Sequence, residues 1–191
     1  GIPLDKKVIA ILPGSRKSEI NHHSKPLVDF INTYKKQNPD VEIILALNKE
    51  SELSGELKLL SKKISVIYDS TQKVLASCDM AVVTSGTATL EAAILAKPMV
   101  VIYKSNKFSN FILSNFFLKT KFISLPNILS QEKIVFELRQ NQVSGKEISE
   151  KVELTFKNQE VIAKKLSLIR DSLLVKDSNK FSIALKEILA K

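Results

Sequence analysis

Short apolar runs alternate with longer stretches of mixed polarity along most of the chain. The runs are rich in β-branched residues and apolar at successive positions, as is typical of parallel strands buried on both faces. They predict strands at 8–12, 41–47, 64–68, 80–83 and 99–103, and a further strand at 121–125. The stretches between them predict helices at 17–37, 50–63, 71–77, 88–96 and 131–139. This alternation indicates the α/β class, with a Rossmann-like parallel sheet and helices on both faces.

From residue 144 onward the pattern is helical only, with helices predicted at 146–156, 159–174 and 181–189. We therefore divide the chain into a lobe of residues 1–143 and a carboxyl-terminal helical extension of residues 144–191. The extension is expected to pack on that lobe or on a partner. Within the first helix, Pro26 leaves open whether the segment is one helix or a broken one.

The stretch 79–103 contains the most informative turn. It reads as strand, small-residue turn, helix and second strand, which is a βαβ unit of about the minimum size. In the turn, Gly86 permits backbone conformations that other residues resist, and free backbone N–H groups at a helix start suit a phosphate. Glu91, one helical turn further on, could accept hydrogen bonds from two ribose hydroxyls. The turn is either such a nucleotide-sugar site or an ordinary strand-to-helix loop with hydroxyl caps.

A second turn, Gly14-Ser15-Arg16, follows the first strand. In parallel α/β sheets ligands bind at the carboxyl ends of the strands, so both turns are candidates. The planar guanidinium of Arg16 could hold a phosphate through two hydrogen bonds, or it could be a solvated charge at the helix start. Neither turn has the glycine pattern of a dinucleotide site or a Walker loop, which disfavours NAD binding and P-loop hydrolysis.

Charge narrows the class of partner. The 191-residue chain is 44% hydrophobic and 26% charged, with a formal net charge of +9. No Asp or Glu occurs from 92 to 131, whereas that segment contains Lys97, Lys104, Lys107, Lys119 and Lys121. Aromatic stacking motifs and arginine-rich runs are missing, so we expect no nucleic acid and favour anionic lipid or a phosphorylated substrate. The adjacent His22 and His23 would point different ways on a helix, so we expect no metal site.

A phenylalanine-rich segment lies within this basic stretch. Its large apolar residues include Phe108, Phe111, Phe116 and Phe117. One interpretation is a helix packed on the sheet or on a missing neighbour. The other is an interfacial helix that enters a bilayer and is steered there by the flanking lysines.

Four motifs occur in a fixed order: LPGSR (12–16), SGTATLE (85–91), KPMVVIYK (97–104) and SLPNIL (124–129). With them the chain, from Lys7 to its end, resembles the carboxyl-terminal half of the lipid-A-disaccharide synthase family. SGTATLE is similar to a pattern in other nucleotide-sugar enzymes, whereas SLPNIL at this distance is more specific. A UDP-N-acetylglucosamine 2-epimerase, a peptidoglycan glycosyltransferase and a non-catalytic UDP-binding module remain the alternatives.

The resemblance implies one lobe of a GT-B fold in an inverting glycosyltransferase. Such an enzyme moves 2,3-diacylglucosamine from UDP to 2,3-diacylglucosamine 1-phosphate and forms a β-1,6 disaccharide on the way to lipid A. It implies a cytoplasmic enzyme, peripheral on the inner face of the inner membrane, without metal or cofactor, and leaves open a homodimer of the full-length protein. The residues implied to bind the UDP donor are Gly14, Ser15, Arg16, Ser85, Gly86, Thr87, Thr89, Glu91 and Asn127. Those implied to face lipid are Lys104, Lys107, Phe108, Phe111, Phe116, Phe117, Lys119 and Lys121.

The chain departs from the family in one respect: the amino-terminal lobe, with the acceptor site and the general base, is absent from this sequence. We therefore expect a fragment that binds the donor and is inactive alone. No catalytic residue is expected in this half, apart from Arg16 as a stabiliser of charge on the departing UDP.

Overall fold

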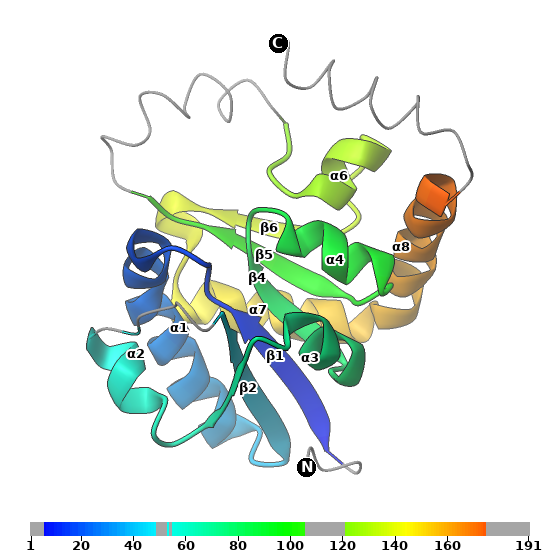
Figure 1. Cartoon of the computed structure of the whole chain (residues 1–191). Helices are drawn as coiled ribbons and strands as arrows, with labels where there is room; N and C mark the ends of the chain where they lie inside the picture. Colours follow the sequence, from blue (N-terminus) through cyan, green and yellow to red (C-terminus); the bar gives the residue numbers. More distant parts are fainter. Residues whose placement is uncertain (1–5, 49–52, 54, 106–120, 175–191) are drawn as a thin grey trace.

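The computed structural model of the chain describes residues 6–48, 53, 55–105 and 121–174. Their strands form one parallel six-stranded sheet in the order β3-β2-β1-β4-β5-β6 (Figure 1). The strands are β1 Lys7–Leu12, β2 Val41–Leu47, β3 Ser65–Tyr68, β4 Met80–Thr84, β5 Met99–Tyr103 and β6 Phe136–Arg139. The helices are α1 Lys17–Gln37, α2 Gly55–Leu60, α3 Thr71–Ser77, α4 Ala88–Ile94, α6 Leu125–Ser130, η1 Gln140–Gln142, α7 Gly145–Lys157 and α8 Gln159–Leu174.

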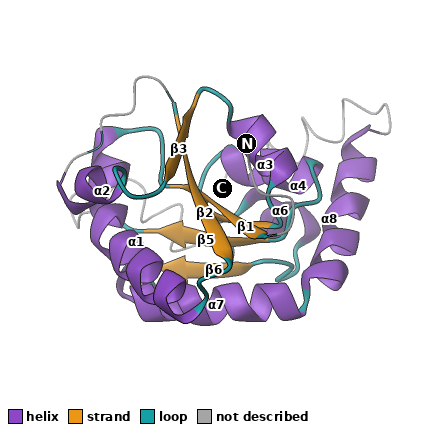
Figure 2. Ribbon diagram, turned by 90° about the horizontal axis from the view of Figure 1, so that it is seen from below, coloured by secondary structure: helices purple, strands orange, loops and turns teal. Residues whose placement is uncertain are grey.

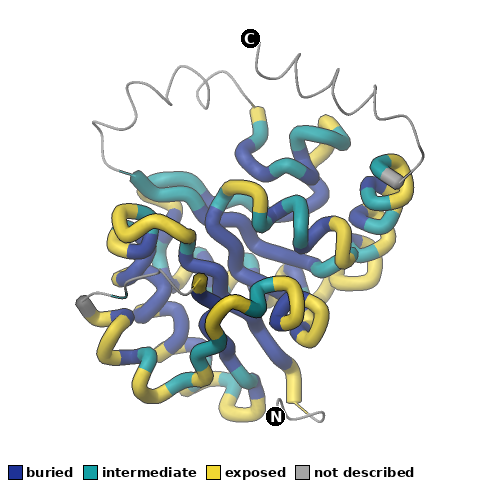
Figure 3. Tube along the Cα trace, in the orientation of Figure 1, coloured by how far each residue is buried: buried dark blue, intermediate teal, exposed yellow. Residues whose placement is uncertain are grey.

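The helices cover both faces of the sheet (Figure 2). Alternate strand residues point to opposite sides, so Ile9 and Ile11 pack with α1, α2 and α7, whereas Val8 and Ala10 pack with α3, α4 and α8. Figure 3 shows the resulting buried centre running through the strands, with exposed residues at the turns and along the helices. The predicted fold class, a Rossmann-like lobe with helices on both faces, is confirmed.

The carboxyl-terminal helices pack on this lobe. Ile148 and Val152 of α7 join one hydrophobic core, and Leu166 of α8 joins the other. The hydroxyl of Tyr34 on α1 also donates a hydrogen bond to Glu153 on α7, at 2.5 Å. The division of the chain at 143–144 remains a prediction, and the helix expected at 181–189 lies outside the described residues.

Two predicted elements between 121 and 139 are wrong. In place of a strand at 121–125, the chain turns and enters α6, where Pro126 occupies the first turn as helix starts favour. In place of a helix at 131–139, α6 ends at Gln131 in a left-handed conformation, φ 54°, and β6 follows. Strand pairing decided this outcome, because β6 adds to the exposed edge of β5 with Val100 opposite Phe136. The helical pattern of residues 131–139 carries no information about the neighbouring strand β5, so it could not predict this pairing.

The first helix is continuous. α1 runs from Lys17 to Gln37 with Pro26 inside it. Its first two turns lie at the carboxyl ends of the central strands, where His23 contacts Thr84 at the end of β4.

Candidate functional site

A cavity of about 730 Å³ lies at the carboxyl ends of the central strands. The strand order reverses between β1 and β4, which makes this edge the topological switch point where α/β sheets bind ligands. Its walls come from the β1–α1 turn, the end of β2, the β3–α3 turn, the β4–α4 turn and Glu91 on α4. A cavity of this size is in the range that holds a small-molecule ligand or cofactor.

The β4–α4 turn forms one wall of the cavity. Gly86 has φ 152°, and a Cβ placed on it would meet nothing within 4 Å, so the backbone there faces open space. Within the described residues, the backbone N–H groups of Gly86 and Thr87 have no hydrogen-bond partner. Glu91 lies on the same side of the cavity, one helical turn further along α4. The structure therefore brings together the predicted donors and the predicted ribose ligand.

Thr89 has a different position from the one predicted for it. Its hydroxyl is fully buried and donates to the carbonyl of Gly86 at 2.7 Å. It also accepts from the backbone N–H of Leu125 at 3.2 Å. Thr89 does not line the cavity; it fastens α6 to the back of the turn. The hydroxyl of Ser85, a cavity residue, donates to the carbonyl of Ile123 at 2.7 Å, and Ile123 does not line the cavity.

The opposite wall is the β1–α1 turn, and the carboxylate of Glu19 already occupies its donors. The backbone N–H groups of Ser15 and Arg16 donate to Oε2 of Glu19 at 3.0 and 3.3 Å. The Arg16 guanidinium reaches Oε1 of the same carboxylate at 3.3 Å and stays 80% exposed. Gly14, at φ 117°, packs so closely that an added Cβ would lie 2.7 Å from Cβ of Glu19.

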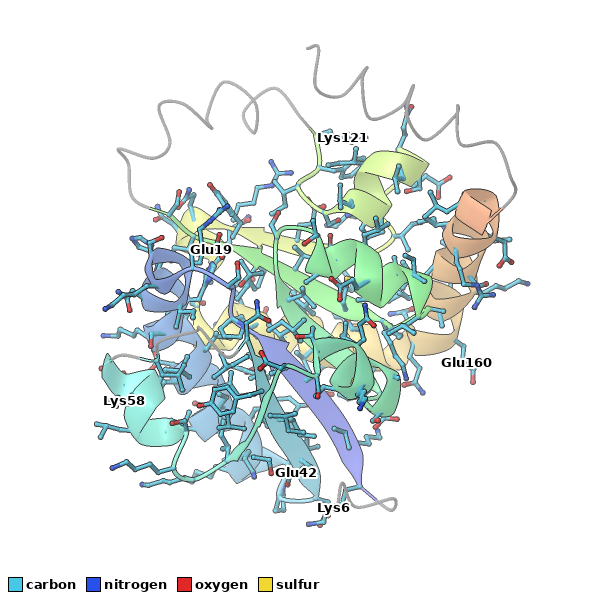
Figure 4. All side chains as sticks on the ribbon, in the orientation of Figure 1. Lys6, Glu19, Glu42, Lys58, Lys121 and Glu160 are labelled. Carbon is cyan, nitrogen blue, oxygen red and sulfur yellow. The ribbon has the colours of Figure 1, made fainter. Side chains whose placement is uncertain are left out.

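Glu19 was missed by the sequence analysis although a signal was present. It stands three residues after the helix-capping position Arg16, which is the spacing of a capping box. Figure 4 shows Glu19 at the end of the sheet opposite Lys6, on the side of the cavity. This turn thus offers the ligand an arginine side chain, whereas its N–H groups are used internally.

The sequence analysis also missed the cavity wall that follows β2 and β3. It consists of Asn48 after β2 and of Asp69 to Lys73 after β3. Asp69 has a left-handed backbone, φ 51°, which turns the chain sharply from β3 into α3. The strand order could have indicated this wall, because β2 and β3 end at the same edge as β1.

Asn127 does not reach the cavity lining. It is fully buried, and its amide donates to the carbonyl of Val135 and to Glu137, both at 2.9 Å. Its carbonyl accepts from the N–H groups of Ile134 and Val135 at 2.8 and 2.9 Å. These bonds connect α6 to the segment that enters β6. The structure gives Asn127 this structural role, and its predicted place near the nucleotide stays a prediction.

Most residues predicted to face lipid lie outside the described part of the chain, namely Lys107, Phe108, Phe111, Phe116, Phe117 and Lys119. Of the other two, Lys104 donates its backbone N–H to His23, and Lys121 places its ammonium 5.3 Å from the ring centre of Phe122. The helices that the structure describes include none both long and apolar enough to cross a bilayer. Among the same residues, no group of three His, Cys, Asp or Glu side chains is arranged to hold a metal.

Solved structures share the fold of this chain at low sequence identity. The glycotransferase of kitacinnamycin superposes with a TM-score of 0.61 at 20% identity, over 91% of this chain and 40% of that one. An S. aureus TarM mutant in complex with Fondaparinux, alpha-GlcNAc-glycerol and UDP gives 0.58 at 14%, over 100% and 36%. A UDP-N-acetylglucosamine 2-epimerase from Listeria monocytogenes, itself named as putative, gives 0.57 at 11%, over 85% and 39%. These matches establish the fold as a Rossmann-like lobe of the GT-B kind.

Sequence relatives are more specific. The lipid-A-disaccharide synthase of Colwellia psychrerythraea is 36% identical over 157 residues, covering 78% of this chain and 39% of that protein. That of Cellvibrio japonicus is 34% identical over 164 residues, covering 84% and 42%. Lipid-A-disaccharide synthase 1 of Legionella pneumophila (strain Paris) is 33% identical over 152 residues, covering 78% and 39%. The chain thus spans about two fifths of the length of these relatives.

A family model described as lipid-A-disaccharide synthetase matches residues 1–190. It covers the cavity walls, the four sequence motifs and the carboxyl-terminal helices together. The family expected from the motifs is confirmed: this chain belongs to the lipid-A-disaccharide synthases.

Proposed function

We propose that this chain is the donor-binding lobe of a lipid-A-disaccharide synthase and that its cavity holds the UDP of UDP-2,3-diacylglucosamine. The observation that carries the proposal is the cavity at the switch point, which has Glu91 beside unpaired backbone N–H groups on one wall and Arg16 on the other. Within the proposal, the N–H groups of Gly86 and Thr87 bind the diphosphate. Glu91 accepts from the ribose hydroxyls.

In this arrangement the lobe stabilises the leaving group. As the sugar departs, negative charge grows on the UDP, and the fixed N–H dipoles favour that charge without reorganising. The Arg16 guanidinium adds positive charge from the opposite wall. The acceptor, 2,3-diacylglucosamine 1-phosphate, and the general base that deprotonates its hydroxyl belong to the other lobe. We assign no catalytic base to the 191 residues of this chain.

Glu91 provides the sharpest test of nucleotide binding. A hydrogen bond to a charged acceptor contributes about 1.5–3 kcal/mol, so UDP should bind about ten- to a hundredfold more tightly than 2′-deoxy-UDP. Glu91→Ala should weaken UDP and abolish the discrimination, since the ribose partner is gone. Isothermal titration calorimetry measures both, with Glu160→Ala on the exposed surface of α8 as the matched control. If wild type binds both nucleotides equally, or Glu91→Ala binds UDP as wild type does, Glu91 is not the ribose ligand.

A comparison of UDP with ADP tests whether the site recognises the nucleobase. Enzymes of this family transfer a sugar from a UDP-linked donor, so ADP should bind less tightly than UDP to the wild-type chain. Equal affinities would leave a generic nucleotide module, the non-catalytic alternative, as the better description. Ligand-observed NMR at matched concentrations measures this difference even when binding is weak.

Transfer should need both lobes. Without the amino-terminal lobe the two substrates are not held face to face, which forfeits the orientation contribution, and the cavity stays open to water. The assay follows formation of disaccharide 1-phosphate from the UDP-linked donor and the monosaccharide acceptor. We expect no turnover by the 191-residue chain and turnover once the other lobe is supplied. Robust turnover by this chain alone would place the catalytic general base within its 191 residues.

For the membrane, we propose that the basic, phenylalanine-rich segment brings the lobe to the anionic cytoplasmic face of the inner membrane. The support is the net charge of +9 and the run from 92 to 131 without an acidic residue. Binding to anionic vesicles should be strong at low salt and weak at high salt, since salt screens surface charges. Absence of sedimentation with vesicles at low salt would instead indicate that the segment is a packing surface for the other lobe.

A homodimer of the full-length enzyme stays an expectation that light scattering can test.

A further inference from the structure

His23 is buried where three strand ends meet. It lies in the second turn of α1 and is fully enclosed. Its Nδ1 is 3.1 Å from the carbonyl of Pro13, which follows β1, and 3.2 Å from the hydroxyl of Thr84, the last residue of β4. Its Nε2 accepts from the backbone N–H of Lys104, just after β5, at 3.0 Å.

These partners fix the state of the ring. A backbone N–H can only donate, so Nε2 must be the unprotonated, accepting nitrogen. The proton of the neutral ring therefore sits on Nδ1, where it is donated to the Pro13 carbonyl and lies close to the Thr84 oxygen. Burial lowers the pKa of His23 from 6.5 to about 4, so the neutral form is present at physiological pH. Among the other titratable groups that act on the ring, Glu19 raises the pKa of His23, whereas His22 and Lys104 lower it.

Two of these contacts join the two turns that form opposite cavity walls. Pro13 precedes Gly14, and Thr84 precedes Ser85, so the ring spans from one turn to the other. The imidazole is short and rigid, and its nitrogens point in fixed directions. It can therefore hold the spacing of the turns in a way that an apolar side chain of similar volume cannot.

We propose that His23 is a positioning residue of the donor site, whose ring holds the Gly14 turn and the Gly86 turn at the separation that a bound diphosphate requires. The proposal rests on the proposed function of the cavity. His23 touches no ligand itself, and it does not line the cavity. It acts through Pro13 and Thr84 on groups that do.

The test compares substitutions of His23 with the same substitution of its neighbour. His23→Phe keeps a ring but removes both nitrogens. His23→Asn places an amide near the position of Nδ1, and His23→Gln places one near the position of Nε2. His22→Gln is the matched control, since this half-buried histidine is adjacent in sequence and does not line the cavity. Leu27→Ala, in the buried core of α1, controls for a general loss of stability.

Calorimetry should show UDP binding about tenfold weaker for His23→Phe than for wild type, which equals the loss of about one hydrogen bond through misalignment of the turns. His23→Asn should restore part of the lost affinity. His22→Gln and Leu27→Ala should bind as wild type does. Hydrogen exchange should show the Lys104 amide protected in wild type and His23→Gln and exposed in His23→Phe. A His23→Phe affinity equal to wild type, or an equal loss in Leu27→Ala, overturns the positioning role. A wild-type chain that binds no UDP overturns the proposed function itself.

Discussion

Acid should destabilise this lobe through one buried histidine. His23 has its folded-state pKa lowered to about 4 from the ordinary value of 6.5, chiefly because burial disfavours the charged ring. Between these two values the unfolded chain binds a proton that the folded chain refuses. The stability associated with His23 is therefore complete above pH 6.5 and is lost progressively as the pH falls towards 4. At about 1.4 kcal/mol per pH unit, the full loss is about 3 kcal/mol.

Substitution isolates this contribution. His23→Gln removes the titrating group, so the difference in unfolding free energy between wild type and variant should shift by about 3 kcal/mol from pH 7.5 to pH 4, against the wild type. Carboxylates that titrate in the same range are common to both proteins and largely cancel in the difference. His22→Gln serves as the control and should keep the steep wild-type dependence.

Urea unfolding at several pH values measures each free energy. The shift should appear mostly below pH 6.5. A difference between wild type and His23→Gln that stays constant from pH 7.5 to 4 would refute the reasoning. It would mean that the ring is solvated or is charged in the fold.

Three other substitutions test contacts that stabilise the fold. Asn127→Ala should lower the unfolding free energy by about 3 kcal/mol or more, because it leaves several buried backbone groups without partners, and thermal denaturation should show the loss. Gly14→Ala should cost about 2 kcal/mol, since it combines a strained backbone with a clash against Glu19; wild-type stability would show that the turn can relax. Tyr34→Phe should cost about 1 kcal/mol in urea unfolding through the lost bond to Glu153, and no change would remove that bond as a link between α1 and α7.

Much of the sheet could be predicted from the sequence because its strands are apolar on both faces. The run 99–103 is apolar at successive positions, as a strand covered by helices on both faces requires, and in the fold its first four residues are buried. The candidate turns could be predicted as well. Gly86 and Gly14 do take positive φ values, and parallel strands necessarily place their ends at one edge.

The region from 121 to 139 shows where this local reasoning stops. A hydrophobic pattern records which positions are apolar but not which strand edge is available, and β6 exists because β5 offers it one. The polar side chains depended on tertiary structure in the same way. Asn127 was placed near the nucleotide by resemblance, whereas in the fold it satisfies the backbone that leads into β6.

What the sequence by itself determined was the alternation of strands and helices up to β5, the helices α7 and α8, the two glycine turns and the family. Only the tertiary structure decided that His23 joins the two turns and that Thr89 binds the start of α6. The physical reason is that these roles depend on distances between residues far apart in the chain. His23 and Thr84 are separated by 61 positions, and their contact follows from the parallel order of β1, β4 and β5 rather than from any local pattern.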